Sequence, residues 1–178
     1  MEYTVDRAII ESNAYMLKFK GLTSSEKGDE LVAHYARQAV LNNDGLSSED
    51  AYFLNAKNGK LLKHQKLGEF GGTVEELPKL KKGELILLIH NHPNNTAFSY
   101  VDFVTLNDFP EIKTMIAAGH DGKVFILSVG DGERLDLSDE NELRYYKNQW
   151  ANAYIRFGGD LGAVKQFAKE WGWIFYER

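Results

Sequence analysis

One uninterrupted apolar segment constrains the fold of this chain more than any other feature. Residues 85–89 are five consecutive aliphatic residues inside the segment 84–90, and no polar residue interrupts them. A strand with one solvated face alternates apolar and polar residues, whereas a strand that is buried on both faces does not. We therefore predict that residues 84–90 form a strand in the interior of a sheet covered on both sides.

The segments around this strand predict the covering layers. Apolar residues recur at helical spacing behind Ser24 and Ser25, which are suited to the N-cap, and again near the C-terminus. The pair Asn58 and Gly59 is typical of a hairpin turn. The fold class predicted is α/β (α+β), a mixed central β-sheet flanked by helices. The helices are expected at 24–41, 100–107, 138–155 and 161–171, and further strands at 51–54, 61–66, 114–118 and 124–128. Residues 1–23 leave a strand or a short helix open, and residues 74–80 a short helix or a loop.

The chain length of 178 residues suits one hydrophobic core, and 43% hydrophobic residues argue against disorder. We predict a principal domain at residues 1–135 and a C-terminal helical extension at 136–178, packed on the same domain. Aromatic residues recur in the extension, and this pattern indicates packing inside the protein more strongly than a face for a partner.

Charge and composition exclude several classes of function. The formal net charge is −5 and the basic residues form no long cluster, so we expect no strong nucleic-acid footprint. The apolar run is too short to span a bilayer, and acidic residues near the N-terminus exclude a signal peptide there. We expect a cytoplasmic protein without membrane association, and the oligomeric state stays open. The chain has no cysteine, so a bound metal must rely on His, Asp or Glu.

The predicted interior strand ends in residues suited to metal binding. His90 and His92 are two apart, and side chains at this spacing on a strand project to the same side. Pro93 cannot donate a backbone hydrogen bond, so the chain can turn away there. Asp102 then falls in the first turn of the next helix. Two imidazoles, one carboxylate and an open fourth position suit Zn²⁺, which we predict as the cofactor.

Simpler interpretations of the same residues remain open. The two histidines could be polar loop residues, and Ser99 with Asp102 fits a capping box, which is a common helix start. The combination of both features directly after the longest apolar run favours a metal site. The other histidines, His34, His64 and His120, have no partner at ligand spacing.

The pattern His90-x-His92-Pro93, followed by Ser99-x-x-Asp102, resembles the signature of the JAMM (JAB/MPN) metallopeptidases. It is most similar to bacterial RadC-like and phage- or toxin-associated JAB domains. The resemblance covers residues 27–130 and implies an MPN-like fold, also described as cytidine-deaminase-like. The loop between His92 and Ser99 has six residues, one fewer than is usual in the family.

The resemblance also implies roles for individual residues. It makes His90, His92 and Asp102 the zinc ligands, and a glutamate upstream the general base. Glu49 occupies the position that corresponds to this glutamate. Glu69, Glu75 and Glu76 are alternative candidates for the general base, but their positions are more typical of surface residues. Ser99 would bind the oxyanion or support the site.

The function that follows is a zinc-dependent hydrolase, a metallopeptidase or isopeptidase, that cleaves an amide bond in a peptide or protein-conjugate substrate. Zinc would lower the pKa of a water molecule towards about 7 and polarise the scissile carbonyl. The alternative is a non-catalytic MPN-like binding module. A metal-dependent nuclease is less favoured, since the sequence His-Asn-His only superficially resembles HNH enzymes.

Overall fold

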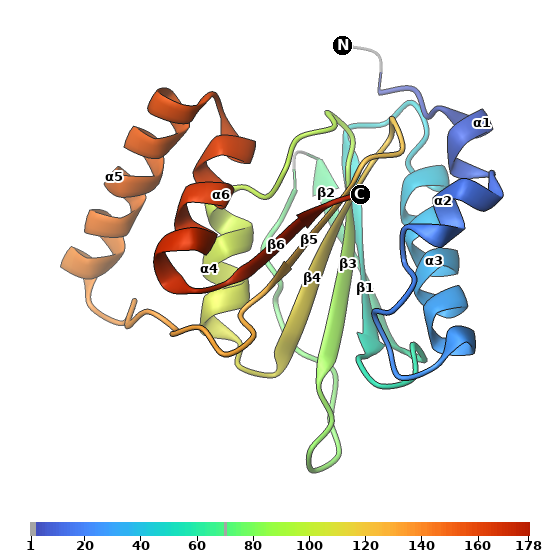
Figure 1. Ribbon diagram of the computed structural model, residues 1–178, viewed down its shortest axis with the longest axis horizontal. Coiled ribbons are helices and arrows are strands. Elements are labelled where there is room, and N and C mark those ends of the chain that lie inside the picture. The colour runs from blue at the N-terminus through green and yellow to red at the C-terminus, as the bar shows by residue number, and fades with distance from the viewer. Residues whose placement is uncertain (1–2, 70) are drawn as a thin grey trace.

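The computed structural model describes residues 3–69 and 71–178, which form a sheet with helices on both faces (Figure 1). Six strands lie in the order β2-β1-β3-β4-β5-β6. Among the described residues, β3 and β4 pair in parallel, and the other neighbouring strands are antiparallel. The prediction of a mixed sheet is therefore confirmed. The strands are β1 (Ser48–Asn55), β2 (Leu61–Glu69), β3 (Ile86–His92), β4 (Ile112–Gly119), β5 (Val124–Ser128) and β6 (Ile174–Glu177).

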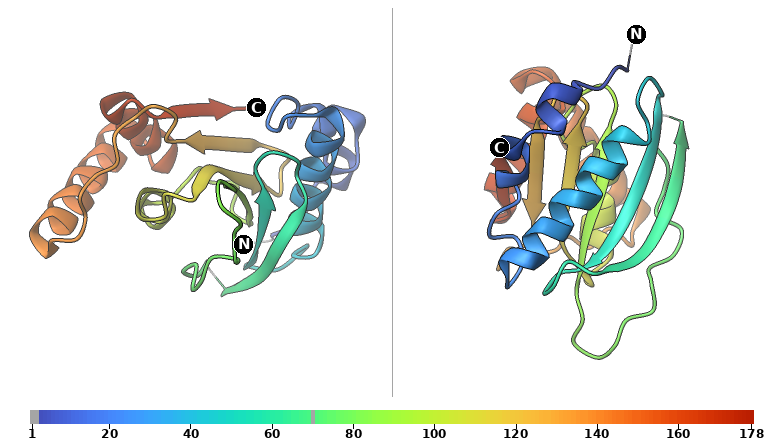
Figure 2. Two further views of the ribbon diagram at one scale, coloured as in Figure 1. Left: turned by 90° about the horizontal axis from the view of Figure 1, so that it is seen from below. Right: turned by 90° about the vertical axis from the view of Figure 1, so that its right-hand side faces the viewer.

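The helices divide between the two faces of the sheet (Figures 1 and 2). One face, here called the α3 face, is covered by α1 (Arg7–Ile10), α2 (Asn13–Leu17) and α3 (Glu26–Leu41). The opposite α4 face is covered by α4 (Tyr100–Asp108), α5 (Glu140–Phe157) and α6 (Asp160–Trp171). Each face of the sheet packs against its helices in a separate hydrophobic cluster, so the sheet lies between two hydrophobic cores.

Strand β3 lies between β1 and β4, and all seven of its residues are buried. Leu88 packs in the α4-face core, whereas Leu87 and Ile89 pack in the α3-face core. The prediction of a strand buried on both faces is confirmed, but the strand spans Ile86–His92 in place of residues 84–90, and Leu85 before it is exposed. Alternation along the strand then directs His90 and His92 to the α4 face and Asn91 to the α3 face.

The first helix and hairpin follow the local signals in the sequence. Ser25 is the N-cap of α3, and its hydroxyl accepts a hydrogen bond from the backbone N–H of Gly28. Gly59 lies in the turn between β1 and β2 with a φ of 70°. A Cβ at Gly59 would come within 2.4 Å of the carbonyl oxygen of Gly28. Glycine is required there both for its backbone conformation and for the close approach of α3 to the hairpin.

The C-terminal helices share a core with α4. The ring of Phe103 lies 5.6 Å from that of Trp150, 5.1 Å from that of Phe167 and 4.8 Å from that of Trp173. The aromatic residues of the extension therefore serve packing to a large extent. Because Phe103 follows Asp102 directly, this packing also holds the first turn of α4 in place.

The predicted C-terminal helical extension, residues 136–178, contains the helices α5 and α6, but it also ends in a strand that the sequence analysis did not predict. Gly172 ends α6 with a φ of 71°, and Ile174–Glu177 then pairs with β5 as the edge strand β6. Most of this short strand is exposed, so no strong apolar pattern announces it. Residues 174–177 adopt the strand conformation because they pair with β5 at the edge of the sheet. Strand β5 lies far away in the sequence, so local patterns do not predict this pairing.

The two ambiguous segments are also resolved. The region before α3 contains the short helices α1 and α2, and residues 74–80 form no helix or strand. No helix among the described residues combines the length and the apolar character needed to cross a membrane.

Candidate metal centre

Three predicted ligand side chains converge at the carboxyl end of β3. The Nε2 atoms of His90 and His92 lie 2.8 Å apart. Asp102, from the first turn of α4, brings Oδ1 within 3.2 Å of the His90 Nε2 atom and Oδ2 within 3.6 Å of the His92 Nε2 atom. Both histidines are buried, and the carboxylate of Asp102 is only 18% exposed.

The donor set fits a zinc ion. Tetrahedral zinc with bonds of about 2.0–2.2 Å has ligand atoms roughly 3.3 Å apart, which is close to the three separations found here. Imidazole nitrogen and carboxylate oxygen are both ordinary zinc ligands. His90, His92 and Asp102 are therefore close enough to share one metal ion.

The ring of His92 is oriented by a hydrogen bond outside the cluster. Its Nδ1 atom lies 2.8 Å from the carbonyl oxygen of Thr96. A carbonyl only accepts, so Nδ1 carries the proton and, in the neutral ring, Nε2 keeps a free lone pair. Metal-binding histidines are commonly fixed in this way. The short loop after Pro93 thus supplies a supporting contact that the sequence did not reveal.

Asp102 takes part in both of the interpretations that the sequence left open. Its Oδ2 atom accepts hydrogen bonds of 2.7 Å from the backbone N–H and the hydroxyl of Ser99, which completes a capping box at the start of α4. Its Oδ1 atom faces His90. Burial opposes the ionised carboxylate, but His90, His92 and Ser99 together hold the pKa of Asp102 well below its usual range. The cap therefore holds the carboxylate in place, and mainly the two histidines favour its ionised form, which is suited to metal binding.

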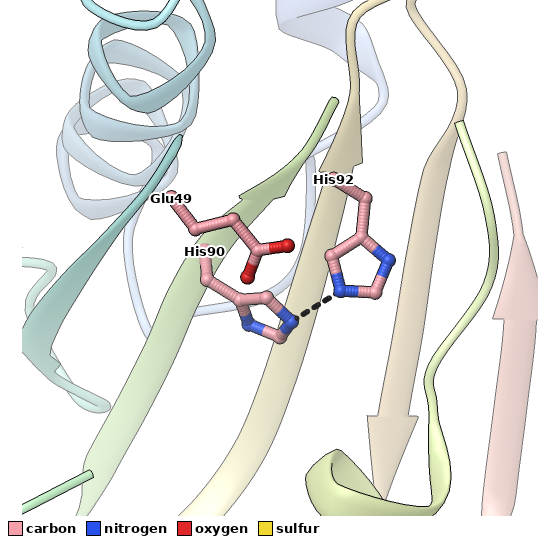
Figure 3. A group of neighbouring side chains, drawn as sticks. All are labelled: Glu49, His90 and His92. Atoms are coloured by element: carbon pink, nitrogen blue, oxygen red, sulfur yellow. Dashed lines mark hydrogen bonds between the residues drawn. The ribbon is translucent and has the colours of Figure 1, made fainter. Parts of the chain in front are cut away.

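Glu49 lies beside the same cluster, at the start of β1 (Figure 3). One of its carboxylate oxygens and the ring nitrogens of His90 and His92 lie within 4.8 Å of one another. Burial raises the pKa of Glu49 to about 7; His92 opposes this shift and Asp102 adds to it. Gly71 covers the carboxylate, since a Cβ there would come within 3.1 Å of Oε2 of Glu49.

Asn91 connects the start of β1 to the end of β3 on the opposite, α3 face of the sheet. Its side-chain oxygen accepts a 2.8 Å hydrogen bond from the backbone N–H of Asp50, and its NH₂ group donates to the carbonyl oxygen of Ser48 at 3.0 Å. These two residues flank Glu49. Asn91 itself lies between the two histidines in the sequence, so it fixes the position of Glu49 relative to His90 and His92.

The buried network continues from Asn91. Asn43 donates to the Asn91 oxygen at 3.4 Å, and Nε2 of His120 lies 3.3 Å from the Asn91 nitrogen. Burial lowers the pKa of His120, and its Nδ1 atom bonds the carbonyl oxygen of Tyr3. Asn91 therefore points to the face of the sheet opposite His90 and His92, so the three residues of the His-Asn-His sequence do not converge on one site.

We expect Asn91→Ala to lower the free energy of unfolding by about 1–3 kcal/mol, because buried groups on Asp50, Ser48 and Asn43 lose a partner. Urea denaturation measures this change. Asn152→Ala, an exposed asparagine on α5, is the matched control and should change stability by less than about 0.5 kcal/mol. Equal effects of the two substitutions would contradict the role of Asn91.

A pocket of about 410 Å³ opens beside the cluster and is lined by Glu49, His92, Ser99 and Asp102. Asp160, the first residue of α6, lines the same pocket. The sequence gave no reason to choose Asp160, since it follows two glycines in the C-terminal extension and matches no motif. Only the packing of α6 on α4 brings it to the site.

The remaining candidate residues lie elsewhere. Among the described residues, the alternative candidates Glu69, Glu75 and Glu76 are exposed and none joins the group that could hold a metal ion. His64 pairs instead with Asp50, with 3.2 Å between Nε2 and Oδ2. Comparison of the chain with models of known families, with curated proteins and with solved structures gave no match.

Proposed function

We propose that this chain is a zinc-dependent hydrolase of the JAMM (JAB/MPN) type, with an MPN-like fold, that cleaves a peptide or isopeptide bond. The observation that carries the proposal is the convergence of His90, His92 and Asp102 next to the partly buried carboxyl group of Glu49. A structural ion alone would not require a neighbouring acid whose pKa is raised towards neutrality.

The two carboxyl groups of the site differ in a way that assigns their roles. The pKa of Asp102 is held low, so Asp102 is a permanent anion suited to binding a cation. The pKa of Glu49 is raised to about 7, so Glu49 can take up and release a proton near neutral pH. Acid and base assignments commonly follow from such a separation of pKa values within one site.

Zinc, when bound, makes a water molecule more acidic and polarises the scissile carbonyl. Glu49 accepts the proton of the attacking water at its carboxylate and then delivers it to the nitrogen of the leaving amine. The Ser99 hydroxyl donates to Asp102 at 2.7 Å and lines the same pocket, and in the proposed reaction it binds the oxyanion or supports the site.

The test is hydrolysis of a mixed peptide library by zinc-loaded protein, with new termini detected by mass spectrometry. We expect cleavage that a chelator abolishes and that added zinc restores. Stoichiometric zinc without cleavage of peptides or protein conjugates would favour the non-catalytic binding module. Zinc-dependent cleavage of DNA in place of peptides would favour a nuclease.

A further inference from the structure

Three acidic residues line the pocket beside the candidate metal centre. They are Glu49, Asp102 and Asp160, and none of the described residues that line the pocket is a lysine or an arginine. The two charges of a zinc ion would be matched by Asp102 and Glu49. The proposed reaction therefore assigns no role to the negative charge of Asp160.

The surroundings of Asp160 show that its charge is poorly compensated. Partial burial raises its pKa, opposed by a hydrogen bond from Trp150 and by His92, while Asp102 raises the pKa further. Among the residues that the structure describes, no lysine or arginine forms an ion pair with Asp160. A carboxylate that has lost water and lacks a cation provides a favourable place for a positively charged ligand.

A simpler explanation is that Asp160 only stabilises the N-terminus of α6, as acidic residues in a first helical turn often do. That explanation accounts for its position in the sequence but not for its position in the pocket. Asp160 is not the N-cap of the helix either. The N-cap residue is Gly159, and no side-chain hydrogen bond caps this end of α6. Among the described residues, Asp102 lies within ion-pair distance of both His90 and His92 and Asp160 of neither, so Asp160 is not counted among the ligands of that ion.

We propose, on the basis of the function proposed above, that Asp160 makes this site selective for substrates with a cationic side chain beside the scissile amide. The substrate class is then a basic peptide segment, whose lysine or arginine side chain enters the pocket and pairs with Asp160. The C-terminal extension thereby contributes specificity as well as packing, because α6 supplies the residue.

The test measures binding rather than turnover. Nα-acetyl-lysine hydroxamate and Nα-acetyl-arginine hydroxamate are titrated into zinc-loaded protein by calorimetry, beside the 2-aminoheptanoic analogue, in which a methyl group replaces the lysine ammonium. Hydroxamate binds zinc in all three probes, so the side chain alone differs. A charge-assisted hydrogen bond in a partly buried place predicts about tenfold tighter binding of a cationic probe.

Asp160→Asn should abolish this preference while it leaves zinc content and the affinity for the methyl analogue nearly unchanged. Glu140→Gln is the matched control, since it removes an exposed first-turn acid from α5 and should keep the preference. Equal affinity of the parent for all three probes, or a preference that survives in Asp160→Asn, would overturn the proposal while the metal site stands. Failure of every probe to bind zinc-loaded protein would remove the proposed function, and with it this inference.

Discussion

The parent chain, produced without a histidine tag, is expected to carry about one zinc ion per molecule, and His92→Ala should lose it. In the proposed site His92 is one of three protein ligands, and its ring is already oriented by Thr96, with 2.8 Å between Nδ1 and the carbonyl oxygen. Loss of a supporting contact around a metal ligand costs roughly 10–100-fold in affinity, so loss of the ligand itself should cost more. Elemental analysis after dialysis measures the zinc content.

A second measurement of the same prediction is thermal unfolding with and without zinc. Binding to the folded state alone stabilises it, by about 2.7 kcal/mol when the free ligand is at 100 times its dissociation constant. We expect zinc to raise the melting temperature of the parent and of His34→Ala, which removes an exposed histidine from α3. His92→Ala should show no such increase. Parent protein without zinc, or His92→Ala with full zinc, would disprove the metal centre.

Glu49→Gln should lower the rate of amide hydrolysis by about 10²–10⁴-fold and leave the zinc in place, because the amide cannot accept a proton. The substitution preserves shape in a position where Gly71 already packs closely against the carboxylate. Glu69→Gln is the control, since Glu69 is an exposed glutamate outside the pocket. It should retain the parent's activity to within about twofold.

The pH dependence should reveal the same group. Glu49 must be ionised to act as a base, so kcat/KM should rise as the pH increases through its pKa. Burial raises that pKa to about 7, and a bound dication lowers it from there, so the acid limb of the profile should lie below about pH 7. Glu49→Gln should remove this limb. Loss of zinc in Glu49→Gln would show instead that Glu49 is a metal ligand, which its distance from the two histidines allows.

Much of the architecture could be predicted because its signals are local. Four of the five aliphatic residues, Ile86 to Ile89, lie in β3, which is fully buried because both faces of the sheet are covered, whereas Leu85 is exposed. Helix α3 begins where Ser25 caps it, and the turn after β1 contains the glycine that its backbone requires. Strand β6 was missed because it owes its conformation to a partner strand rather than to its own residues.

The candidate ligands were also accessible to sequence reasoning, for a geometric reason. Residues two apart on a strand share a face, so His90 and His92 had to point together once β3 was recognised. Asp102 was within reach because a short loop connects β3 to α4. Whether Ser99 and Asp102 form a helix cap or a metal site could not be separated, and the structure shows why, since one carboxylate oxygen serves the cap and the other faces His90.

The sequence by itself determined the interior strand, the pair of imidazoles at its end and the carboxylate that begins the next helix, because neighbouring residues interact through the regular geometry of strand, turn and helix. Tertiary structure alone decided the proton affinity of Glu49, the attachment of β1 through Asn91 and the arrival of Asp160 at the pocket. These properties depend on burial and on contacts between segments that are distant in the chain. Such contacts arise only when both faces of the sheet have been covered.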